Sequence, residues 1–213
     1  MTLPTQLRRA GPTALFAAAM AVSLGLASCM SLFPKTAPAT LYRFEAQTPA
    51  DPGAQAPRTV AVLHAAGSFV PAAAGDRMLT VTGSEVAYIA AARWVSPAAV
   101  LFDDAVNRTL QASPSVRVAS VGELARPDYI LRVDVLTFET RYVNGAQAAP
   151  TVVIEARASL SNVQTRASMG SIMLAAQAPA SDNRVGPIVA AYSQATTQVM
   201  GQLENWLGQR ARS

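Results

Sequence analysis

The chain of 213 residues contains one cysteine and one histidine, and both counts exclude whole classes of chemistry. With Cys29 as the sole thiol, neither a disulfide within the chain nor a thiolate metal site can form. His64 has no second histidine with which to hold zinc or iron. We therefore expect no metal site and no cofactor. Hydrophobic burial must supply the stability of a chain whose residues are 51% hydrophobic.

The residue patterns that mark common enzyme sites are also missing. The sequence has no Gly-x-Ser-x-Gly elbow and no glycine-rich phosphate loop. The serines beside glycines, Ser68, Ser84 and Ser171, are typical of turns. Asp103-Asp104 are neighbours whose side chains point apart on a helix, and His64 ends an apolar strand, where a structural or surface role is expected. We expect a protein that is not an enzyme; a hydrolase with an unrecognised serine is the alternative.

Charge is sparse and evenly spread along the chain. Charged residues make up 14% of the sequence, and the net charge is +4. Removal of residues 1–28 leaves 15 basic against 13 acidic residues, a net charge of +2. The arginines are scattered singly among acidic residues, so nucleic-acid binding is not expected.

The N-terminal residues have the layout of a lipoprotein signal peptide. Arg8 and Arg9 precede an apolar run at 14–26, which at about 13 residues is shorter than the roughly 20 needed to span a bilayer. The run ends in a lipobox, Leu26-Ala27-Ser28-Cys29, whose small residues suit a narrow peptidase site. Cys29 is then the first mature residue and carries acyl chains such as palmitate. Two or three such chains make a membrane anchor effectively permanent.

Beyond the lipobox, the composition indicates one folded domain. We expect a signal peptide at 1–28, a lipidated, proline-containing tether at 29–40, and a domain at 41–213. Hydrophobic periodicity predicts a helix that begins at Ser96-Pro97, with the serine as its cap, and runs to about Gln111. A second helix is expected at about 187–210, anchored in the core by Trp206. Strands are expected at 41–45, 59–63, 78–81, 85–90, 116–120, 129–142, 151–161 and 165–177. This order predicts an α+β domain with a mainly antiparallel sheet and two main helices packed on one face.

The expected strand at 129–142 changes phase within its length. Its apolar residues fall on odd positions up to Val135 and on even positions from Leu136. A β-bulge near Val135-Leu136 is therefore predicted, since a bulge keeps both sets on one face. Asn144-Gly145 then signals a hairpin turn, and the following strands complete an antiparallel meander.

Two apolar segments are candidates for contact with a partner protein or a lipid tail. One is the loop 67–74, with Phe69 and Val70, and the other is 88–94, with Tyr88 and Trp94. An exposed apolar patch would mark a binding surface. Burial of the same residues in the core is the alternative.

Several short segments follow the lipobox in a distinctive order over residues 40–207. They are Leu41-Tyr42-Arg43-Phe44, a stretch from Gly83 through Ile89 into Arg93-Trp94-Val95-Ser96-Pro97, a long valine-rich strand ending near Phe138, and a last helix ending in Trp206-Leu207. In this order and spacing the chain resembles the ABC-type transport auxiliary lipoproteins, a family that includes paraquat-inducible protein C.

The resemblance implies a periplasmic lipoprotein that works with an ABC permease, its ATPase and a mammalian-cell-entry (MCE) protein. Such a system moves lipids or other hydrophobic compounds between the envelope membranes. The lipoprotein would dock the MCE assembly at the membrane that holds its anchor, as a monomer or a homo-oligomer. Met30, in place of aspartate after the cysteine, favours the outer membrane. The alternative is a stand-alone lipid-binding or outer-membrane assembly lipoprotein, which would need an internal apolar cavity.

Overall fold

The structure, a computed structural model, describes residues 38–46, 60–119 and 126–210. The chain divides into two units, Met1–Pro38 and Ala39–Ser213, and the described residues belong to the second except for Pro38. The predicted signal peptide, the lipobox with Cys29 and most of the tether lie outside the described residues. Their prediction stays a prediction.

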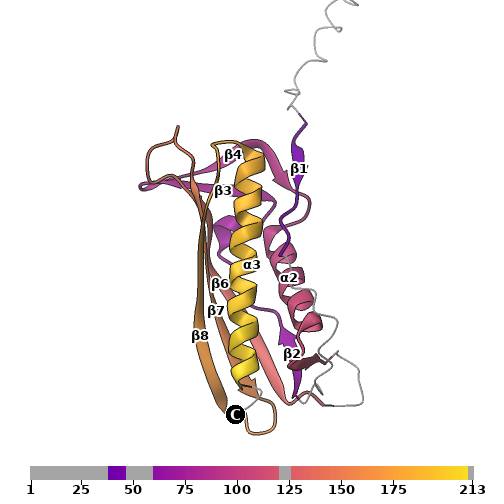
Figure 1. Cartoon of the computed structure of the whole chain (residues 1–213). Helices are drawn as coiled ribbons and strands as arrows, with labels where there is room; N and C mark the ends of the chain where they lie inside the picture. The colour runs from indigo at the N-terminus through magenta and orange to yellow at the C-terminus, as the bar shows by residue number, and fades with distance from the viewer. Residues whose placement is uncertain (1–37, 47–59, 120–125, 211–213) are drawn as a thin grey trace, which may run out of the picture. The chain divides into compact units, whose positions relative to one another are not determined.

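The described residues form eight strands, two α-helices and one short 3₁₀ helix (Figure 1). Their bounds, in chain order, are β1 (Thr40–Tyr42), β2 (Val60–Ala65), η2 (Pro71–Ala73), β3 (Arg77–Thr82), β4 (Glu85–Trp94), α2 (Ala98–Ala112), β5 (Val116–Val118), β6 (Tyr129–Arg141), β7 (Thr151–Asn162), β8 (Ser168–Pro179) and α3 (Val185–Arg210). All of the predicted strands and both helices are present, with ends that move by a few residues. The α+β class is confirmed.

The thirteen residues of β6 organise the sheet. One edge of β6 pairs with β7, which pairs in turn with β8, so the predicted antiparallel meander is confirmed. The other edge is shared, since β2 runs beside residues 129–132 and β3 beside residues 140–141. Between these two strands, Phe69 bridges to Val135. The segment that follows β2 therefore fills the gap in the edge of β6.

The sheet is mixed: its longest ladders are antiparallel, as expected, but it also contains parallel pairs that the sequence did not predict. Its parallel pairs are β1–β4, β2–β5, β2–β6 and β3–β6, and its antiparallel pairs are β3–β4, β6–β7 and β7–β8. Between β2 and its parallel neighbours the chain passes through β3, β4 and α2, and crossovers of this kind return a strand in the same direction. Alternation of apolar residues shows which face of a strand is buried, not which strand lies beside it.

The predicted bulge is present. Val135 pairs with Ala156 and Thr137 with Glu155, so Leu136 is the extra residue of β6. Leu136 is 43% exposed, whereas the residues before and after the change of phase, Val135 and Phe138, are buried. The bulge therefore keeps a single apolar face along the whole strand.

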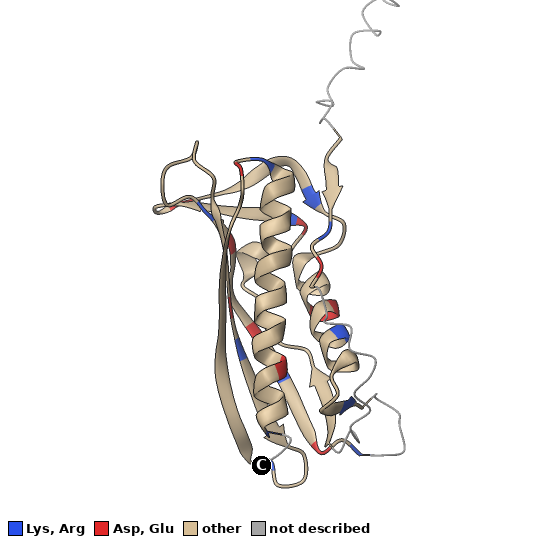
Figure 2. Cartoon of the chain, in the orientation of Figure 1, with Lys and Arg blue, Asp and Glu red and all other residues tan. Residues whose placement is uncertain are grey.

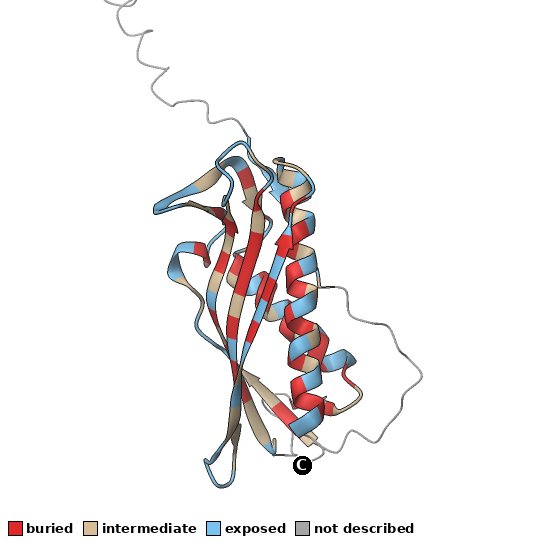
Figure 3. Cartoon of the chain, turned by 60° about the vertical axis from the view of Figure 1, so that its left-hand side comes forward, coloured by how far each residue is buried: buried red, intermediate tan, exposed pale blue. Residues whose placement is uncertain are grey.

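Both helices cover the same face of the sheet (Figures 1 and 3). The serine cap predicted for α2 is wrong: Pro97 stands at the N-cap position, and no side chain caps the helix. The carbonyl oxygens of Gly75 and Ala74 accept the first helical N–H groups, from Ala98 at 2.9 Å and Ala99 at 3.3 Å. Backbone carbonyl groups of a neighbouring loop thus satisfy the N–H groups that a serine hydroxyl would otherwise cap.

Aromatic rings form the centre of the core between the helices and the sheet. Phe44 lies 5.0 Å from Trp94, and Phe138 lies 4.8 Å from Tyr192 of α3, measured between ring centroids. The hydroxyl of Thr140 donates to the Tyr192 hydroxyl oxygen at 3.2 Å, and burial raises the pKa of Tyr192. Trp206 is 6% exposed, as expected for a core anchor.

Candidate functional site

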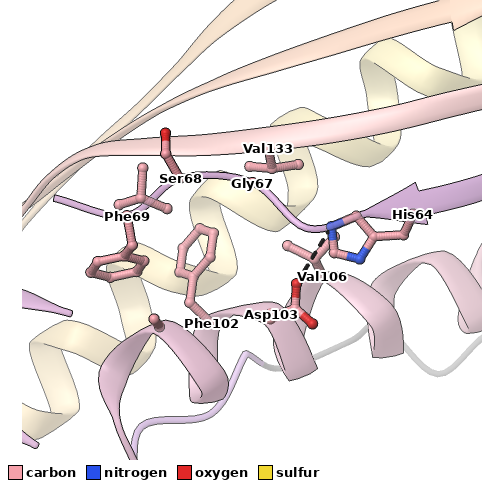
Figure 4. Close-up of a pocket in the computed structure, with 10 residues that line it drawn as sticks. His64, Gly67, Ser68, Phe69, Phe102, Asp103, Val106 and Val133 are labelled. Atoms are coloured by element: carbon pink, nitrogen blue, oxygen red, sulfur yellow. Dashed lines mark ion pairs between the residues drawn. The ribbon is translucent and has the colours of Figure 1, made fainter. Parts of the chain in front are cut away.

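His64, the single histidine, lines a small pocket between β2 and α2 (Figure 4). The His64 side chain is 6% exposed, and its Nδ1 lies 3.0 Å from Oδ1 of Asn107. Its Nε2 lies 3.6 Å from Oδ1 of Asp103, and the Asn107 amide donates to the other Asp103 oxygen at 3.1 Å. His64 thus ties β2 to α2, the structural role expected from the sequence. The pocket's volume is about 40 Å³, which has room for water and not for an acyl chain.

Ser68 lines the same pocket but is held by β6. Its hydroxyl and its backbone N–H both donate to Oδ1 of Asp134, at 2.7 and 2.8 Å. In Figure 4 the hydroxyl points away from His64. Nucleophilic catalysis by serine needs a hydrogen bond between the hydroxyl and a base, and the ring nitrogens of His64 face α2 instead. Ser68 and His64 are therefore not paired with each other in this pocket.

Asp134 holds the loop after β2 through its charge. Partial burial alone would raise its pKa, but the hydrogen bonds from Ser68 and from Arg132, whose Nε lies 3.0 Å away, outweigh burial and lower the pKa. The carboxylate is therefore ionised at neutral pH, and it fixes the segment that carries Phe69.

The four residues predicted to contact a partner or a lipid differ in burial. Trp94 is 2% exposed and packs in the aromatic core, so the contact role expected for it is wrong. Phe69 is half-buried, with its ring 5.3 Å from that of Phe138, and Val70 is half-buried beside it. The hydroxyl of Tyr88 donates to the Ala72 carbonyl oxygen at 3.0 Å, and the guanidinium of Arg77 covers its ring. A contact role for Phe69, Val70 and Tyr88 stays a prediction.

A larger groove runs between the segment after β1 and α3, and sequence reasoning missed it. Its volume is about 540 Å³, and its lining residues are Arg43, Glu45, Ala190, Ser193, Gln194, Thr197 and Gln198. The Glu45 N–H donates to the Ser193 hydroxyl at 3.2 Å, and Glu45 also pairs with Arg43 at 3.5 Å. Hydroxyl and amide groups of this kind suit hydrogen bonding to a polar surface.

A sequence signal for this groove does exist. From Val185 to Leu203 the helix carries no charged residue, although Ala190, Gln194 and Gln198 are exposed. The nearly uncoloured helix is plain in Figure 2. The exposed face of a helix usually carries charged residues, so the absence of charge from Val185 to Leu203 is a signal that can be read from the sequence alone.

Among the described residues, no helix is long and apolar enough to cross a membrane. In the same part of the chain, no three His, Cys, Asp or Glu side chains gather in a way that could hold a metal ion.

Comparison with known proteins identifies the family. The family model described as "ABC-type transport auxiliary lipoprotein component" matches residues 42–204. The chain is similar to the crystal structure of protein XCC0632 from Xanthomonas campestris, of family DUF330, with 27% identity and a TM-score of 0.70 over 82% of this chain and 97% of that one. A second solved structure, of an uncharacterized protein, has 16% identity and a TM-score of 0.61 over 79% and 98% of the two chains, and supports the fold alone. No match was found among curated proteins.

Proposed function

Since the chain belongs to the family of ABC-type transport auxiliary lipoprotein components, we propose that it is a membrane-anchored, non-enzymatic accessory protein of an ABC/MCE-type system. That system would move lipids or other hydrophobic compounds across the cell envelope. The match over residues 42–204 carries the proposal, because it takes in nearly the whole described domain.

The anchor in this proposal is the lipid on Cys29. The lipobox supports it, because two or three acyl chains on the cysteine would hold the protein at the membrane. Met30 favours an outer-membrane location facing the periplasm. Substitution Met30→Asp is expected to move the protein to the inner-membrane fraction on a density gradient. An unchanged distribution would contradict the sorting argument.

The geometry of the pockets supports a docking protein over an enzyme or a lipid carrier. The pocket at His64 is too small for an acyl chain, and the Ser68 hydroxyl bonds to Asp134, whose lowered pKa makes it a weak base, and not to His64. The larger groove is open to solvent, so it lacks the enclosure that a stand-alone lipid carrier needs.

The test is recovery of partners after crosslinking in cells. Tagged full-length protein should bring down the MCE protein, the permease and the ATPase of its own system. A matched Cys29→Ser protein should fractionate away from membranes and recover less of the permease. Recovery of none of these partners by the lipidated protein would overturn the proposal. A Cys29→Ser protein that still supports transport would overturn the role of the anchor. Light scattering on the purified protein would decide between monomer and homo-oligomer.

A further inference from the structure

Strand β8 ends the meander and leaves one edge open in the described part of the chain. It pairs with β7 over its length, and among the described residues no strand pairs with its other edge. An open edge presents unpaired N–H and C=O groups, which are a template for pairing with another chain. Proteins usually protect such an edge with charged side chains, prolines or bulges.

The residues of β8 provide almost none of this protection. The strand reads SMGSIMLAAQAP from Ser168 to Pro179, with no charged residue and with proline only at its end. Its register with β7 is unbroken from Gly170 to Pro179. The edge is therefore long, regular and uncharged.

One side chain of α3 closes the middle of this edge. The Ala175 N–H donates to Oε1 of Gln202 at 3.1 Å, and the Nε2 of Gln202 donates to the Ala175 carbonyl oxygen at 2.8 Å. In an antiparallel pair, every second residue exchanges its N–H and C=O bonds with the partner strand, and the residues between them point these groups the other way. Because the N–H and C=O of Ala175 bond to Gln202, they point away from β7. By the same alternation Ser171, Met173 and Gln177 project their backbone groups to the open side.

The carboxamide of Gln202 has the chemistry of a peptide group. It offers one acceptor and one donor to the two backbone groups of a single residue, as the facing residue of a neighbouring strand would. Gln202 thus occupies the position that the backbone of an added strand would take at Ala175. Any such strand must displace it.

We propose that Gln202 keeps the β8 edge closed against strand pairing with a second copy of this chain. The residues of the strand favour a second β8 as the occupant. When two identical strands pair, any charged residues bring like charges close together, but β8 has no charged residue, so no such repulsion opposes the pairing. Such a contact is isologous and ends at two copies, so opening the edge produces a dimer. The inference is independent of the transport role, because it concerns the bare domain.

The test compares three variants in the mature chain carrying Cys29→Ser, which is free of lipid. Gln202→Ala removes both hydrogen bonds and opens the edge. Gln202→Lys removes the same bonds but places a charge at the edge, which should prevent pairing with another strand. It therefore distinguishes the effect of losing the bonds from the effect of leaving the edge open to a second copy. Gln198→Ala changes an exposed glutamine one turn earlier in α3 and is the matched control.

Two measurements are needed: hydrogen exchange at the Ala175 amide at low concentration, where the chain is not paired with a second copy, and molar mass by light scattering over a range of concentrations. For Gln202→Ala we expect exchange about tenfold faster and a mass twice that of the parent as the concentration rises. For Gln202→Lys we expect the faster exchange without the increase in mass, and for Gln198→Ala neither change. Unchanged exchange in Gln202→Ala would contradict the contact. An unchanged mass would contradict the second copy as the occupant of this edge.

Discussion

Replacing Gly67 by alanine is expected to destabilise the domain strongly, because the added methyl group has no room. Gly67 lies in the segment that follows β2 and runs beside β6. An ideal Cβ built on it lies 1.7 Å from the carbonyl oxygen of Val133, and real Cβ atoms essentially never approach another heavy atom within 3.0 Å. The segment and the strand must therefore separate by about 1.3 Å, the difference between these two distances.

Besides the two bonds from Ser68 to the Asp134 side chain, two backbone–backbone hydrogen bonds attach this segment to β6, and both of these would be lost by such a shift. The Val135 N–H donates to the Ser68 carbonyl oxygen at 2.8 Å, and the Val70 N–H donates to the Val135 carbonyl oxygen at 2.9 Å. A lengthening of about 1.3 Å takes both beyond hydrogen-bond range. With about 1 kcal/mol for each bond and about 1–3 kcal/mol for overpacking, we expect the free energy of unfolding to fall by about 3–5 kcal/mol.

Equilibrium urea unfolding, followed by tryptophan fluorescence, measures this loss. Gly75→Ala is the control, because a Cβ on Gly75 meets no atom within 4 Å. It should leave stability unchanged or raise it by up to about 1 kcal/mol, since alanine restricts the unfolded chain. A Gly67→Ala protein within about 0.5 kcal/mol of its parent would refute the reasoning.

Three further features of the domain are tested by substitution, with a control variant for two of them. Thr196→Val removes a buried hydroxyl without a hydrogen-bond partner in the described part of the chain, so thermal unfolding should show a gain of about 1 kcal/mol. Thr140→Val should show a loss, since its hydroxyl has a buried partner. Because the pKa of Asp134 is lowered in the folded protein, its contribution to stability is complete above about pH 4 and disappears as the pH falls through the folded value. Unfolding measured against pH should therefore show the parent losing its advantage over Asp134→Asn in acid. Ala91 has φ +54° within β4, so Ala91→Gly should stabilise by about 1 kcal/mol in urea unfolding, whereas Ala90→Gly should destabilise.

The elements of the fold could be predicted because their signals are local. The apolar stripe of α3 and the phase change in β6 each lie within one segment, and both are seen in the structure. The cap of α2 could not be predicted, since the groups that satisfy Ala98 and Ala99 are the carbonyl oxygens of Ala74 and Gly75, which are more than twenty residues earlier in the chain. A serine before the first turn of a helix predicts a cap only where no loop from elsewhere in the chain bonds to the first helical N–H groups.

The candidate site was predicted in part. The sequence predicted a structural or a surface role for His64 from its place at the end of an apolar strand, and its partners on α2 favour the structural one. The surface role of Trp94 was wrong, because the aromatic residues that enclose it, Phe44 and Tyr192, come from distant parts of the chain. An apolar segment has the same sequence pattern whether it faces solvent or a ring from another element.

The sequence by itself determined the features that need only neighbouring residues. These are the lipobox that predicts an anchor at Cys29, the amphipathic stripes that place two helices on a sheet, and the family to which the chain belongs. Only the tertiary structure decided which strands run parallel, why position 67 admits nothing but glycine, and how Gln202 closes the edge of β8. Those features depend on atoms from segments far apart in the chain, and their distances are set by packing, which no local pattern records.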